Sequence, residues 1–313
     1  ATARPWRSCA RSSSPAAANG AASTAAPADD FTRKINARGT LSITDGSFGT
    51  LAFTNLTTTL TMDQQVVRLD PVAMKLYDGT MTGAATLDMS RTPPVYTVMA
   101  ETAGIDTDAL LTANLQMKDT LSGDLTGRLN VTTSGAARDA ALANARGDGT
   151  IRIENGHLGG INVLKVLSRA SDLLGERSLK EVSGRLAREG TDFSLLNADL
   201  KIAGGCVISE SLSMTSPDLE LKDDGELNMI AGTIKVAGQI IFSQALSEAM
   251  AQEKSKAVDY FWDPRRERVN LPITLSGPID APTPNIDWST ASGRIAGRKV
   301  REAVGEKLKK VGL

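Results

Sequence analysis

The stretch LYDGTMTGAATLDMS, residues 76–90, decides the fold class of this chain. Its Asp78-Gly79 step, followed by Gly83, is compatible with a loop that cradles a phosphate or with a tight turn between two strands. A phosphate loop requires a helix that begins directly after the glycines. Residues 80–89 instead alternate between apolar and polar side chains, and Asx-Gly steps are typical of β-hairpins. The stretch therefore predicts a hairpin turn followed by a strand.

Alternation with a period of two residues recurs along most of the chain. It is clear in the runs GTLSI, TLTMD, VAMKLYD, LTGRLNV, NADLKIAGG, VISESLSMTS and VNLPITLSGPID. Such alternation is typical of half-buried strands with one apolar and one polar face. Turn-forming steps lie between the runs and are each predicted to reverse the chain: Asp45-Gly46, Asp78-Gly79, Asn155-Gly156, Gly204-Gly205 and Asp224-Gly225. The fold is therefore predicted to be mainly antiparallel β.

The remaining segments are expected to flank or interrupt this sheet. Residues 1–32 are rich in Ala and Ser and short of large aliphatic residues, which predicts a disordered linker. Helices are expected near 161–176, near 243–261 after a Ser243 cap, and as a short turn at 106–115. The β domain is assigned to 33–288 and a C-terminal helix to 289–313.

Composition excludes some classes of function. The 313 residues carry a net charge of −1, whereas a nucleic-acid-binding face needs a basic excess. Aromatic residues make up 4% of the chain, which is low for a protein that stacks bases or sugars. No apolar run approaches the roughly 20 residues of a membrane-spanning helix. Cys9 lies in the predicted linker, so we expect no structural disulfide with Cys206.

We find no constellation of residues that would support an enzyme. The chain lacks the common catalytic and metal-binding motifs, and its single histidine, His157, is expected to be an exposed residue beside a turn. Asp106 and Asp108 are interpreted as the cap and first turn of a short helix. We therefore predict a non-enzymatic protein without cofactor or metal.

The segment 289–313 combines an apolar stripe with many cationic side chains. Such a basic amphipathic helix either lies on an anionic membrane surface or docks on the end of the sheet, and the sequence leaves both open. The candidate membrane-surface residues are Arg294, Arg298, Lys299, Arg301, Lys307, Lys309 and Lys310.

Several blocks, in order between residues 36 and 288, resemble the AsmA-like family. The first is LDPVAMKLYDGTMTGAATLDMSRTPPVYTVMAETAGIDTDALL, in which a strand pair around an Asp-Gly step precedes a GID…LL helical turn. LSGDLTGRLNVTTSGA, GDGTIRIENGHLGGINVLKVL, TDFSLLNADLKIAGGCVISESLSMTSPDLELKDDGELNM and VNLPITLSGPIDAPTPNID follow. The chain is shorter than full-length members and lacks their N-terminal transmembrane helix.

The resemblance implies an envelope protein of Gram-negative bacteria, located in the periplasm and anchored to the inner membrane by a segment upstream of Ala1. It implies a long curved antiparallel sheet folded into an elongated, taco-like groove. The implied partners are phospholipid and envelope assembly proteins, with no nucleic acid.

The alternating positions then give candidate residues for the lining of a lipid groove. They are Leu60, Met62, Met74, Leu76, Met81, Leu87, Met89, Leu129, Leu200, Ile202, Leu212, Met214, Ile273 and Leu275. The same alternation would also build an ordinary closed β core. In that case the protein would be a structural component of outer-membrane protein assembly, whose sheet edges recruit a partner.

Overall fold

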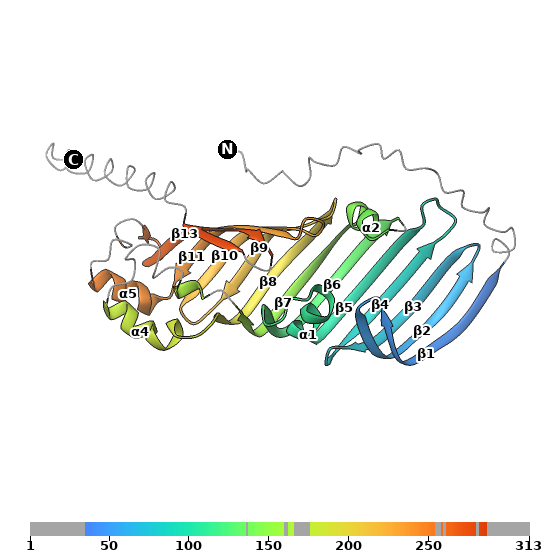
Figure 1. Ribbon diagram of the computed structural model, residues 1–313, viewed down its shortest axis with the longest axis horizontal. Helices are drawn as coiled ribbons and strands as arrows, with labels where there is room; N and C mark the ends of the chain where they lie inside the picture. The colour runs from blue at the N-terminus through green and yellow to red at the C-terminus, as the bar shows by residue number, and fades with distance from the viewer. Residues whose placement is uncertain are drawn as a thin grey trace.

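The computed structural model describes residues 35–135, 137–159, 162–165, 176–253, 258, 261–279 and 282–286. These residues form one open antiparallel sheet of 14 strands, with a few short helices along its margins (Figure 1). The predicted fold class, mainly β with one long open sheet, is confirmed. The predicted linker and C-terminal helix lie outside the described residues.

The strands follow one another in the sheet almost in sequence order, and only the last three depart from it. The order ends β11-β13-β12, and β14 pairs with β13. The bounds are β1 Asn36–Phe48, β2 Leu51–Asp63, β3 Val66–Leu76, β4 Gly79–Asp88, β5 Val95–Asp106, β6 Leu121–Ser134, β7 Arg146–Leu158, β8 Thr191–Ala203, β9 Cys206–Thr215, β10 Leu219–Asn228, β11 Thr233–Phe242, β12 Trp262–Asp263, β13 Arg268–Pro278 and β14 Thr283–Ile286.

Within the described part of the chain, four helices with defined bounds connect or flank these strands. Their bounds are α1 Thr107–Leu115, α2 Arg138–Asn144, α4 Glu176–Leu186 and α5 Gln244–Gln252. Asp106 caps α1 by accepting hydrogen bonds from the backbone N–H groups of Asp108 and Ala109, as expected from the sequence. Ser243 caps α5 through its hydroxyl, which accepts from Leu246 N–H. Of the helix expected at 161–176, residues 166–175 lie outside the described residues. The helix α4, which follows them, was not expected from the sequence.

The Asx-Gly prediction is right at two steps and wrong at three. Asp78-Gly79 and Gly204-Gly205 reverse the chain. Asp78, Gly204 and Gly205 have the positive φ that these turns require, whereas Gly79 is already the first residue of β4. Asp45-Gly46, Asn155-Gly156 and Asp224-Gly225 instead lie inside β1, β7 and β10.

Two of these internal glycines make room for an aromatic ring rather than a turn. A Cβ on Gly46 would lie 2.6 Å from Cζ of Phe53 on the paired strand. A Cβ on Gly156 would lie 2.1 Å from Cζ of Phe193. Glycine inside a strand often marks such a close approach, which a local sequence pattern does not distinguish from a turn.

The expectation of no structural disulfide is also wrong. Cys206 is 1% exposed and disulfide-bonded. The chain has one other cysteine, Cys9, which lies outside the described residues.

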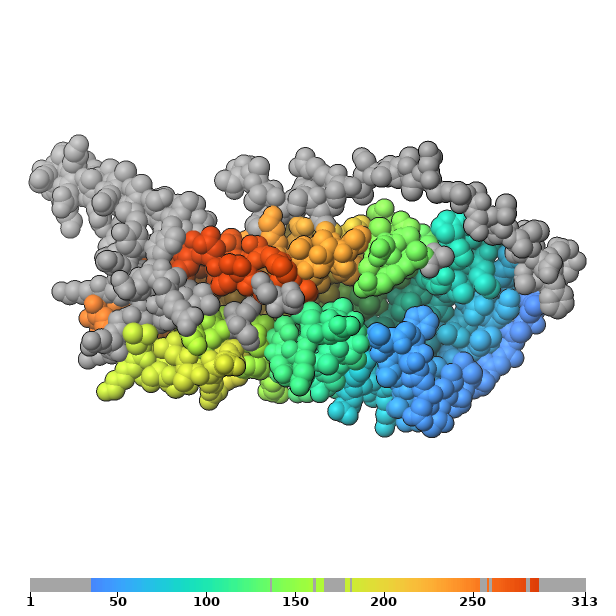
Figure 2. All heavy atoms as spheres, viewed as in Figure 1, coloured from blue at the N-terminus to red at the C-terminus, as the bar shows by residue number. Residues whose placement is uncertain are grey.

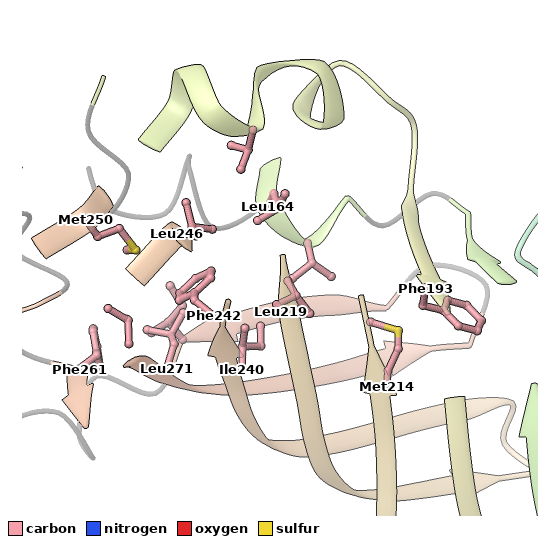
Figure 3. Packing of buried hydrophobic residues seen from close by; sticks show 14 of the residues in the cluster. Leu164, Phe193, Met214, Leu219, Ile240, Phe242, Leu246, Met250, Phe261 and Leu271 are labelled. Carbon is pink, nitrogen blue, oxygen red and sulfur yellow. The ribbon is translucent and has the colours of Figure 1, made fainter. Parts of the chain in front are cut away.

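The main hydrophobic core covers only one end of the sheet. Residues from β8 to β13 pack there against α4, α5 and Val163–Leu164, and Figure 3 shows Phe242, Ile240 and Leu271 pointing toward Leu246 and Met250. Phe242, Ile240 and Met250 are fully buried. The helices thus close the C-terminal end of the sheet, and the N-terminal strands lie outside this core.

Candidate functional site: an apolar face that runs along the sheet

The register of the sheet places the apolar positions of successive strands on one face. Directly paired residues point to the same side of an antiparallel sheet. Met62 pairs with Val67, which pairs with Leu87, which pairs with Tyr96. Ala100 pairs with Leu129, Leu129 pairs with Gly149, and Gly149 pairs with Leu200. Met214 pairs with Leu221, which pairs with Ile240. We define the apolar face as the side of the sheet that carries these residues.

Thirteen of the fourteen candidate lining residues lie on the apolar face. The pairs Met74–Met81, Leu212–Asp223 and Ile273–Gly238 extend it in both directions. The fourteenth, Met89, follows the end of β4, and its backbone N–H donates to Gln65 C=O at 2.9 Å. The candidates are therefore brought together as a continuous surface, which sequence alternation alone could not establish between distant strands.

Two β-bulges keep the apolar face in phase where strict alternation would fail. Positive φ at Asn155 shifts the phase of β7 so that both Ile153 and Leu158 contact the core. β9 carries an extra residue near Ser211. The Ser211 hydroxyl accepts from Asp199 N–H at 2.9 Å and donates to the Asp199 carboxylate at 3.0 Å, which satisfies the backbone at the bulge.

Over the N-terminal strands the apolar face is open at several positions, although Val72 and Ala100 are buried, and over the C-terminal strands it is closed. Leu41, Val98 and Leu129 are 37%, 39% and 36% exposed. Met214, by contrast, is 4% exposed and belongs to the main core, against which Ile273 also packs. Figure 2 shows the open part as a recess between an upper rim, with β13 and α2, and a lower rim, with α1 and the β1–β2 hairpin.

Small residues lower the floor of this recess. Gly83, Ala85 and Gly147 occupy its positions on β4 and β7, each paired with a neighbour on the apolar face. A Cβ on Gly147 would lie 2.0 Å from the carbonyl oxygen of Asn130, so the strands approach too closely there for a side chain. The recess is therefore shaped by the backbone as well as by the side chains.

A set of side-chain contacts holds the lower rim at the N-terminal end. Asn114 of α1 donates to the Tyr77 hydroxyl at 3.0 Å and accepts from the Thr50 hydroxyl at 2.8 Å. Thr50 lies between β1 and β2, whereas α1 follows β5, so these bonds draw the first hairpin toward a helix three strands away in the sheet. Figure 1 shows the β1–β2 hairpin bending back toward α1 at this margin of the sheet.

The opposite face of the sheet is polar. Its side chains include Glu101, Arg128, Arg152 and Asp199, which border a hollow of about 580 Å³. Arg152 pairs with Glu154 at 2.7 Å, and this hydrogen bond holds the pKa of Glu154 below its usual range. This hollow has acidic and basic residues in balance and lacks the apolar lining of the recess.

A buried carboxyl group lies on the apolar face. Asp223 is 6% exposed, and its Oδ1 accepts from Gln239 N–H at 2.8 Å, whereas Oδ2 has no hydrogen-bond partner. Burial raises the pKa of this carboxyl from 3.8 to about 7, and the nearby Asp224 adds to the rise. The sequence predicted a turn at the adjacent Asp224-Gly225 step, so the burial of Asp223 inside β10 was not expected.

The single histidine, His157, belongs to a local group of hydrogen-bonded side chains. His157 lies in β7, where Nδ1 is 2.6 Å from Asp192 Oδ1 and Nε2 is 2.9 Å from Glu189 C=O. Both ring nitrogens therefore face acceptors, and the hydrogen bonds from His157 and Arg188 hold the pKa of Asp192 below its usual range. Among the described residues, no group of three or more His, Cys, Asp or Glu is arranged to hold a metal ion.

The candidate residues for membrane contact, Arg294 to Lys310, lie outside the described residues. None of the described helices is long and apolar enough to cross a membrane. Residues that the sequence reading missed include Val98, Leu41 and Ile43 on the apolar face. The alternation of Tyr96, Val98 and Ala100 would have indicated β5 as a lining strand.

No curated protein and no solved structure matches the chain in a similarity search. A family model does match, over residues 2–212, which is more than half of the chain. That match contains the first eight strands and most of β9, including the open part of the apolar face. On this match the chain belongs to the AsmA family, which indicates a role associated with the cell envelope.

Proposed function

We propose that the protein binds or conducts phospholipid along the open part of the apolar face, in the periplasm, as part of outer-membrane assembly and lipid homeostasis. The observation that carries the proposal is the continuity of apolar side chains across successive strands, with Leu41, Val98 and Leu129 left exposed. An exposed contiguous apolar surface of this kind marks a binding site in a soluble protein.

The physical reason for such a surface lies in the cost of moving an acyl chain through water. Exposing one CH₂ group to water costs about 0.8 kcal/mol, so a sixteen-carbon chain costs on the order of 12 kcal/mol. A groove lined by alternate side chains of successive strands removes most of this penalty. The small floor residues Gly83, Ala85 and Gly147 leave room for a chain to lie against the sheet.

Two adjacent residues of β5 provide a matched test. Val98 lies on the apolar face and Met99 on the polar face, and both are exposed, at 39% and 53%. We expect Val98→Glu to abolish most of the phospholipid that co-purifies with the protein, as measured by mass spectrometry after gentle extraction. Met99→Glu introduces the same charge one residue away and is expected to leave that amount unchanged.

Circular dichroism and thermal unfolding of both variants control for folding. Because both side chains are already exposed, neither variant should lose more than about 1 kcal/mol of stability. The proposal fails if wild-type protein retains no phospholipid, or if Val98→Glu and Met99→Glu retain it equally. Met214, in contrast, is unsuitable as a test position because a charge in the main core would unfold the protein.

A further inference from the structure

The two edges of the sheet differ in how they are protected. At the C-terminal edge, β12 has two residues and β14 has four, so little regular backbone is left open. At the other edge, β1 has 13 residues, and no described strand pairs with its outer side. Natural sheets usually protect an open edge by short strands, prolines or bulges.

β1 is long and has neither a proline nor a bulge, and its only charged residues are Arg38 and Asp45. Its register with β2 runs from Asn36–Asp63 to Phe48–Leu51 without a shift. Eleven of its 13 residues are exposed, and the other two, Ile43 and Gly46, are half-buried. The apolar face also continues to this edge, because Leu41 and Ile43 pair with Thr58 and Leu56. In the described part of the chain, the sheet therefore ends in a long strand whose outer edge can accept another strand.

The sequence of β1 is complementary to itself in the antiparallel direction. Ser42 is the middle residue of Asn36–Phe48, so full overlap of two copies places Ser42 opposite itself. Leu41 then lies opposite Ile43, and Thr40 lies opposite Thr44, so apolar meets apolar and polar meets polar. Arg38 lies opposite Gly46 and Asp45 lies opposite Gly39, so no like charges face each other. Opposite pairs of these kinds stabilise an antiparallel ladder.

We propose that two copies of this chain associate through antiparallel pairing of β1 with β1, centred on Ser42. A two-fold axis normal to the sheet generates this interface and uses the same surface of both copies. Such an axis leaves the two apolar faces on the same side of a joined sheet. The interface depends on backbone hydrogen bonds and on β1 alone, so it does not require that the apolar face binds lipid.

The two-fold axis gives a specific crosslinking test in the full chain. Cα atoms of directly opposite residues in an antiparallel pair are about 4.5–5.5 Å apart, which a disulfide can bridge. Under mild oxidation, Ser42→Cys should therefore form a covalent dimer on non-reducing gels. Thr44→Cys is the matched control on the same strand, since it would be offset by four residues, about 13 Å, from its own copy.

Light scattering after size exclusion supplies the second measurement. We expect the wild-type chain to have the mass of two chains, and Leu41→Lys to shift the dimer equilibrium at least tenfold toward the monomer. The added lysines repel each other across the two-fold axis and block the edge. A wild-type mass of one chain at all concentrations would overturn the proposal and leave the edge to a different protein. Equal crosslinking of Ser42→Cys and Thr44→Cys would overturn it as well.

Discussion

At the residue scale, residues of the same type have different structural roles in this chain. Asp78 takes positive φ in a turn, whereas Asp223 lies in the middle of β10 as a buried carboxyl on the apolar face. Glycine after Asx likewise either follows a turn, as at Gly79, or leaves space for an aromatic ring, as at Gly156. The difference arises because the neighbour that decides each role lies on another strand.

The raised pKa of Asp223 predicts that stability falls as pH rises. The folded state keeps the proton up to about pH 7, whereas the unfolded chain releases it near 3.8. Between these values the folded state binds more protons, so the free energy of unfolding decreases with pH and the full loss is present above the folded pKa. The loss from this single group is at most about 4 kcal/mol, from 1.36 kcal/mol per unit of pKa shift.

Asp223→Asn should remove this dependence. We expect the variant to be more stable than wild type above pH 8 and to have similar stability near pH 4, as measured by urea unfolding. Asparagine keeps the acceptor for Gln239 N–H and carries no charge at high pH. Asp148→Asn, at an exposed position of β7, serves as the control. Parallel pH profiles for Asp223→Asn and wild type would contradict the assignment.

At the element scale, local sequence determines where helices begin, and contacts between elements determine what they do. Asp106 and Ser243 cap α1 and α5 as their side-chain chemistry predicts. The role of α1 in holding the first hairpin through Asn114 and Thr50 depends on a contact across 64 residues of sequence. Similarly, Ser178 of α4 donates from its backbone N–H and its hydroxyl to Glu253, just beyond α5.

The cap of α1 can be tested by substitution. Asp106→Ala removes an acceptor for two backbone N–H groups and is expected to lower the free energy of unfolding by about 1 kcal/mol. Asp106→Asn retains a side-chain acceptor and should lose only a fraction of that amount. Hydrogen exchange of the α1 amides should increase in Asp106→Ala. Equal stability of the alanine and asparagine variants would show that the side chain does not act as a cap.

At the scale of the whole molecule, one sheet serves two purposes. Its apolar face is packed against α4 and α5 at the C-terminal end and is open over the N-terminal strands. Both alternatives considered from the sequence, a closed core and an open groove, thus describe different parts of the same surface. The alternating pattern is the same in both parts. The difference between them lies in which elements cover the sheet.

Truncation of one leucine in each part should separate them. Leu271 is fully buried in the main core, so Leu271→Ala is expected to cost about 2–5 kcal/mol. Leu129 is 36% exposed, and Leu129→Ala is expected to cost less than about 1 kcal/mol. Chemical denaturation of the two variants measures both values. A large loss for Leu129→Ala would mean that the open part is covered by protein in solution.

The sequence by itself determined the strand class, the turn at Asp78-Gly79, the caps of α1 and α5, and the sidedness of thirteen candidate residues. These features depend on neighbours within a few positions, since a period of two fixes the face of a side chain and a cap bonds to its own helix. Only the tertiary structure decided which glycines lie inside strands, where Asp223 is buried, and where the apolar face is covered. Those outcomes depend on contacts between residues far apart in the chain, such as Gly156 with Phe193 and Leu246 with the sheet, which no local pattern encodes.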